Sequence, residues 1–88
     1  MQIRVGERTH AARWIFPVDH NGETRLMMAL ASTETIARIA QDLDGADVIE
    51  KTVEGRPGII ERFEGFKRLL IISRDNADGL TIVTMARG

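Results

Sequence analysis

Two histidines and one aspartate form the one grouping of imidazole and carboxylate in this sequence that is worth testing as a metal or acid–base site. His10 lies near the N-terminus, and Asp19 and His20 stand together before Asn21-Gly22. Zinc needs three or four ligands that converge at about 2 Å. A loop and a turn give these three residues no spacing that would bring them together. We therefore expect no metal or acid–base site, and we interpret His20 as a solvated turn residue.

Other catalytic arrangements are missing from the sequence. The chain has no Cys, which excludes thiolate catalysis, thiolate metal sites and disulfides. Its two serines, Ser32 and Ser73, do not stand in the Gly-x-Ser-x-Gly pattern of hydrolases. We expect no catalytic residue, no metal and no cofactor, so the chain is predicted not to be an enzyme.

Acidic and glycine-containing segments offer two further candidate ligand sites. Asp42, Asp44 and Asp47 surround a predicted helix end, but they lack the Gly and closing Glu of a calcium loop. We interpret them as a solvated acidic rim, although acidic residues at a helix C-terminus oppose the helix dipole. Residues 55–58 include Pro57, which removes one N–H from any phosphate cradle, so this segment is predicted to be a plain turn.

Length and composition bound the class of protein. Eighty-eight residues with a net charge of −1 suit one domain, residues 1–88, without a strong attraction to nucleic acid or anionic lipid. No apolar run in the sequence is long enough to cross a bilayer. We expect a cytoplasmic protein without a membrane partner.

Two turn signals predict two β-hairpins. Asn21-Gly22 supports a two-residue turn between apolar runs at 14–18 and 24–30, and Pro17 predicts that the first run is an edge strand or carries a bulge. The turn at 76–79 separates two more β-rich runs. In the first hairpin the turn predicts these opposing pairs: His20 and Glu23, Val18 and Arg25, Phe16 and Met27.

One helix is expected at about residues 33–44. Ser32 or Thr33 can cap it, and an apolar stripe at i, i+3, i+4 and i+7 runs from Ile36 to Leu43 before Gly45 ends it. Residues 2–5 are predicted to be a strand, and residues 7–12 a loop.

The segment at 46–66 is ambiguous. Residues 47–53 are predicted to be a strand. Residues 59–66 fit either a second strand or a helical stripe, and we favour strands because Gly65 would weaken a helix. The predicted fold is α+β: one domain with a mostly antiparallel twisted sheet or small barrel of 5–7 strands and one helix.

The first hairpin carries apolar residues on both faces, because Ile15-Phe16 and Met27-Met28 are consecutive pairs in predicted strands. One face can meet the helix, and the other needs more of the chain or a partner to cover it. A closed barrel that buries both faces is the alternative. The expected interface consists of Trp14, Phe16, Met27 and Met28, with Arg13 and Arg25 at its rim.

These features favour a non-enzymatic interaction or assembly module that forms a homo-oligomer. By analogy of fold class, such a domain could be a subunit of a larger viral or prophage-like particle. The alternative is a nucleic-acid-binding domain, since residues 56–88 contain six basic and four acidic residues. Its contact residues would surround Phe63 and Phe66; they are Arg62, Lys67, Arg68 and Arg74.

Overall fold

The computed structural model describes residues 1–30, 32–44, 46, 49–75 and 79–88, and the side chains of all of these except 71–75. The predictions made for Gly45, for Asp47 and Val48, and for the turn at 76–78 therefore lie outside the described residues. The elements, in chain order, are β1 (Gln2–Val5), β2 (Arg8–Ala11), β3 (Trp14–His20), β4 (Glu23–Leu30), α1 (Thr33–Asp42), β5 (Ile49–Thr52), β6 (Ile60–Arg62), β7 (Phe66–Asp75) and β8 (Leu80–Arg87).

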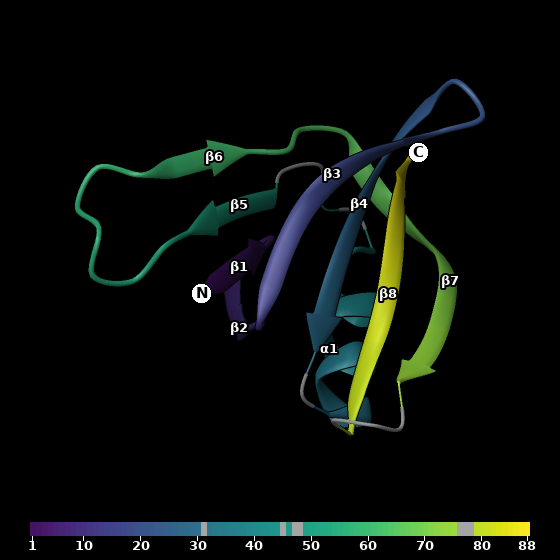
Figure 1. Cartoon of the computed structure of the whole chain (residues 1–88), viewed down its shortest axis with the longest axis horizontal. Coiled ribbons are helices and arrows are strands. Elements are labelled where there is room, and N and C mark those ends of the chain that lie inside the picture. Colours follow the sequence, from purple (N-terminus) through teal and green to yellow (C-terminus); the bar gives the residue numbers. More distant parts are fainter. Residues whose placement is uncertain (31, 45, 47–48, 76–78) are drawn as a thin grey trace.

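The strands form two four-stranded sheets in which every neighbouring pair is antiparallel. The small sheet has the order β2-β1-β5-β6, and the large sheet has the order β3-β4-β8-β7 (Figure 1). The predicted α+β class with one helix is confirmed. The described residues form eight strands rather than 5–7, and these divide between two sheets.

The first hairpin has the predicted register. His20 pairs with Glu23 and Phe16 with Met27, as the two-residue turn requires. Asn21 and Gly22 both have positive φ, 51° and 78°, which is the geometry that favours Asn-Gly in this turn. β3, which contains Pro17, lies at an edge of the large sheet as predicted.

The predicted loop at residues 7–12 is wrong, because residues 8–11 form β2. Gly6, with a φ of 62°, begins a tight turn that pairs Val5 with Arg8 and Ile3 with His10. The one buried residue of β2 is His10, which is not an apolar side chain. Apolar periodicity therefore gave no strand signal here.

Helix α1 begins as predicted. The Ser32 hydroxyl accepts a hydrogen bond from the Thr35 backbone N–H at 3.2 Å, which satisfies one free donor of the first turn. Ile36 and Ile39 are buried on one side of the helix. In the described part of the chain, no helix has the length and apolar character that crossing a membrane requires.

The ambiguous segment contains a strand rather than a helix. β5 and β6 pair antiparallel with Lys51 opposite Glu61, and the Phe63 N–H donates to the Ile49 carbonyl. Between these strands, Gly55 and Gly58 adopt positive φ in exposed turns. The segment predicted to be a plain turn is therefore a turn.

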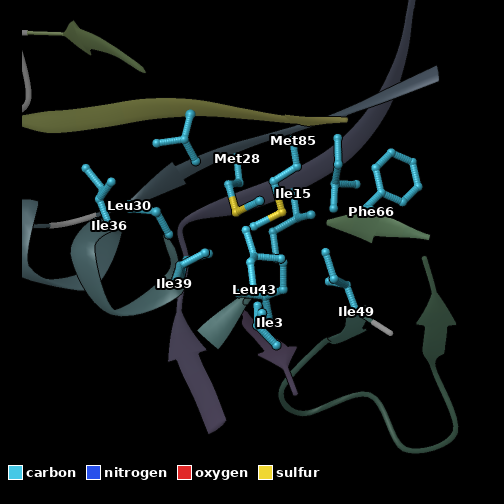
Figure 2. Close-up of a cluster of buried hydrophobic side chains, with 14 residues drawn as sticks. Ile3, Ile15, Met28, Leu30, Ile36, Ile39, Leu43, Ile49, Phe66 and Met85 are labelled. Atoms are coloured by element: carbon cyan, nitrogen blue, oxygen red, sulfur yellow. The ribbon is translucent and has the colours of Figure 1, made fainter. Parts of the chain in front are cut away.

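The core lies between the large sheet on one side and α1 with the small sheet on the other. Figure 2 shows Ile15, Met28 and Met85 of the large sheet pointing toward the helix and the small sheet. The core side chains contributed by α1 and the small sheet include Ile3, Ile36, Ile39, Leu43 and Ile49. Both layers cover the same face of the large sheet, which we call its inner face.

Candidate interaction surface

Strand alternation assigns a second set of side chains to the opposite, outer face of the large sheet. Residues that pair across neighbouring strands share a face, and so does every second residue along a strand. In Figure 1, α1 lies behind this sheet, and no described element lies in front of it. By this register the outer face carries Trp14, Phe16, Val18, Arg25, Met27, Ala29, Ile82, Thr84 and Ala86.

Aromatic and sulfur-containing side chains occupy part of this outer face. The Trp14 and Phe16 rings lie 4.9 Å apart between centroids, and Phe16 is 44% exposed. Opposite Phe16, the Met27 sulfur accepts a hydrogen bond from the Thr84 hydroxyl at 3.0 Å. Such side chains are enriched in the buried centres of protein interfaces.

The small residues between these large side chains are already buried. Ala29, Thr84 and Ala86 belong to the outer face, yet each is almost inaccessible to water. Since no described element covers this face, the bulky neighbouring side chains of the same face must cover them. The outer face is thus a packed apolar layer in which the side chain of Phe16 is partly exposed to solvent.

Met28 does not belong to this surface, which corrects the sequence-based expectation. It pairs with Ile15, both side chains point into the core, and Met28 is 0% exposed. The pair Met27-Met28 does supply both faces, as predicted. A single sequence did not show which of the two residues faces inward.

The two arginines expected at the rim flank the apolar layer. Arg25 lies between Val18 of β3 and Ala86 of β8, with its Nη2 3.8 Å from a Glu23 carboxylate oxygen. Its Nε atom is buried and finds no hydrogen-bond acceptor within the described residues. Arg13 precedes β3, is exposed, and donates its backbone N–H to the Ala29 carbonyl.

The residues considered for acid–base chemistry do not come together. His10 Nε2 lies 2.8 Å from Asp42 Oδ2, and both side chains are largely buried. Asp19 instead accepts a hydrogen bond from Thr24, and His20 is exposed beside the first hairpin turn. Among the described residues, no three His, Cys, Asp or Glu side chains are grouped so that they could hold a metal.

Contacts with two residues of β2 account for the carboxylate at the end of the helix. Asp42 ends α1, where the helix dipole disfavours an anion. His10 and Arg8, the latter 3.5 Å away through its Nε, place β2 beside this carboxylate. The contacts of His10 and Arg8 with Asp42 therefore join the end of the helix to the small sheet. His10 and Asp42 are 32 residues apart, and no local sequence pattern predicts such a contact.

The residues of the nucleic-acid alternative are divided between the two sheets. Arg62 lies in the small sheet and forms an ion pair with Glu50 at 3.0 Å, whereas Lys67 and Arg68 belong to β7. The side chain of Arg74 lies outside those described.

The aromatic rings near these residues are not arranged as an exposed stacking platform. Phe66 is only 1% exposed, and Phe63 packs edge-on against it at 6.2 Å. The Arg87 guanidinium lies 5.2 Å from the centre of the Phe66 ring. Bases would need open ring faces for stacking, and Phe66 offers none.

Comparison of the chain with protein families, with curated proteins and with solved structures gave no match. The functional assignment therefore depends on the surfaces described above.

Proposed function

We propose that this protein is a non-enzymatic interaction module that self-associates through the outer face of its large sheet. The observation that carries the proposal is that this face is apolar and has no described element over it. Exposed apolar patches of this kind mark interaction sites in soluble proteins. A second sheet packed face to face at about 10 Å would cover the patch.

A second copy of the chain fits this face chemically. It brings an identical apolar layer, and a two-fold axis would let both copies use the same residues. It also brings the Glu23 carboxylate, an acceptor for which the Arg25 guanidinium has an unused buried donor. In the monomer, burying such a donor without a partner costs about 1–3 kcal/mol.

A larger assembly would need a further contact. A two-fold face-to-face contact closes on itself, so a viral or prophage-like particle would require a second surface, such as a sheet edge. We propose the homo-oligomer as the basic unit of any such assembly. Its proposed location is the cytoplasm, because a chain without Cys needs no oxidising compartment to fold.

Sedimentation equilibrium over a wide protein concentration range tests the proposal. We expect the mass to rise from 9.8 kDa toward twice that value. Retention on heparin should be weak and nearly independent of salt. A mass of 9.8 kDa at every concentration, with steeply salt-dependent retention, would instead favour nucleic-acid binding.

A further inference from the structure

A groove separates the end of α1 from β7. It has a volume of about 620 Å³. Ala40 and Leu43 line it from the helix side, and Leu69 lines it from the strand. Leu43 is buried and Leu69 half-buried, so these residues form an apolar floor. The polar lining residues are Gln41, Asp44, Lys67 and Arg68.

The strand beside this groove is open to pairing. β7 ends the strand order of the large sheet and has β8 as its single strand neighbour among the described residues. An edge strand presents backbone N–H and C=O groups that another extended chain can bind. A segment added along β7 would extend the large sheet, and every second side chain would point toward the groove.

The charges along this edge determine which kind of extended segment can pair with β7. Lys67 and Arg68 are exposed, and neither forms an ion pair within the described part of the chain. Antiparallel pairing of β7 with β7 of a second copy about a two-fold axis near Lys67 and Arg68 would bring these cations together, which is destabilising. Carboxylates on an incoming strand would be attracted to the same cations.

The shape of the edge limits the length of the occupant. Pairing between β7 and β8 shifts register at Phe66/Arg68 and again at Leu69/Ile71. Such bulges bend and twist a strand, which opposes long edge-to-edge pairing between sheets. A short segment is less affected by them than a whole sheet edge.

We propose that this groove binds a short, extended segment of another protein in which apolar and acidic residues alternate. Its apolar side chains contact Leu43 and Leu69 in the groove. Its acidic side chains point to the opposite side of the sheet, where Arg68 shares a face with Ala86. Asp44 at the groove rim repels carboxylates that enter the groove, which fixes this orientation. The groove lies on the helix side of the sheet, whereas Arg68 belongs to the outer face, so the bound segment borders the proposed self-association face along the β7 edge.

Titration of the full chain with two capped peptides tests this site. The probe is acetyl-Val-Asp-Val-Asp-Val-Asp-Val-amide, and its comparison peptide carries Lys in place of each Asp. In NMR spectra we expect the acidic peptide to shift the amide signals of Leu43 and Leu69. We expect at least tenfold weaker binding of the Lys peptide. We also expect weaker binding of an acidic peptide in which Pro replaces the Val at position 3, since Pro cannot donate to a strand.

Charge reversal distinguishes specific binding from loss of folding. The double variant Lys67→Glu, Arg68→Glu should lose affinity for the acidic peptide at least tenfold and gain affinity for the Lys peptide. The control variant Arg56→Glu, in the exposed turn at 55–58, should leave both affinities unchanged. Equal binding of both peptides, no binding at millimolar concentration, shifts confined to Trp14 and Phe16, or preferential binding of oligothymidine would each overturn the proposal.

Discussion

On the outer face of the small sheet, the nearly buried carboxylate of Glu50 lies between Arg4 at 2.8 Å and Arg62 at 3.0 Å. The outer face of the large sheet instead carries the apolar side chains of Trp14, Phe16 and Met27. The first surface satisfies its buried charge within the chain. The second is apolar, and its one buried unpaired donor, Arg25 Nε, has no acceptor among the described residues.

The two sheets therefore differ in the polarity of their outer faces. Antiparallel sheets commonly bury one face and expose a polar one, as the small sheet does. The large sheet is apolar on both faces, which is typical of a sheet placed between two layers. Its inner face is covered by the helix and the small sheet, and no described element covers its outer face, where we propose that a second copy packs.

Among the substitutions considered, that of Phe16 should have the largest effect, and it should act on the association constant. Phe16→Asp places a charge on the apolar face at a residue that is 44% exposed in the protomer. In a two-fold dimer both copies carry it, and a loss of about 2 kcal/mol per copy corresponds to about 1,000-fold weaker association. Sedimentation measures the change.

The matched control uses the small sheet. Ile60 is 59% exposed on the outer face of β6, and Ile60→Asp should leave the association constant unchanged. If Ile60→Asp dissociated the oligomer and Phe16→Asp did not, the roles of the two faces would be reversed.

Replacing His10 should destabilise the fold without weakening association. His10→Ala removes a buried partner of Asp42 and leaves that carboxylate with Arg8. We expect the free energy of unfolding, measured with urea, to fall by about 2 kcal/mol. His20→Ala, in an exposed position, is the control and should change it little. An equal fall in the free energy of unfolding for both variants would show that the His10–Asp42 contact does not stabilise the fold.

Neutralising Glu50 should cause the smallest change, a slight fall in the free energy of unfolding. Glu50→Gln keeps the shape of the side chain but removes its charge from between two arginines. Both arginines are more than one-third exposed, so solvent screens the pairs, and we expect a loss of about 1 kcal/mol in the free energy of unfolding. Urea midpoints at equal m-value measure it. A change in association instead would place Glu50 in the interface.

Local signals predicted the parts of the fold that local geometry determines. Asn21-Gly22 set the register of the first hairpin, and Ser32 marked the start of the helix. β2 was missed because its inward residue is His10, which apolar alternation does not detect. The number of sheets was missed because strand pairing across the chain, such as that of β1 with β5, leaves no local pattern.

The candidate surface was predicted in part for the same reason. Consecutive apolar pairs showed that both faces of the first hairpin are apolar, and the structure places Phe16 and Met27 outward. The inward position of Met28 depends on the side on which α1 packs, which the hairpin sequence does not contain. The ion pairs of Asp42 and Glu50 join distant segments and could not be predicted from spacing.

Intermolecular nuclear Overhauser effects in a mixture of labelled and unlabelled chains test the central claim most directly. The Met27 methyl group reports on the outer face of the large sheet, and the Ile60 methyl groups report on the small sheet. We expect contacts between the Met27 methyl of one copy and aromatic protons of Trp14 or Phe16 of another, with none to Ile60. Contacts to Ile60 alone, or a protein that stays monomeric at millimolar concentration, would contradict the claim.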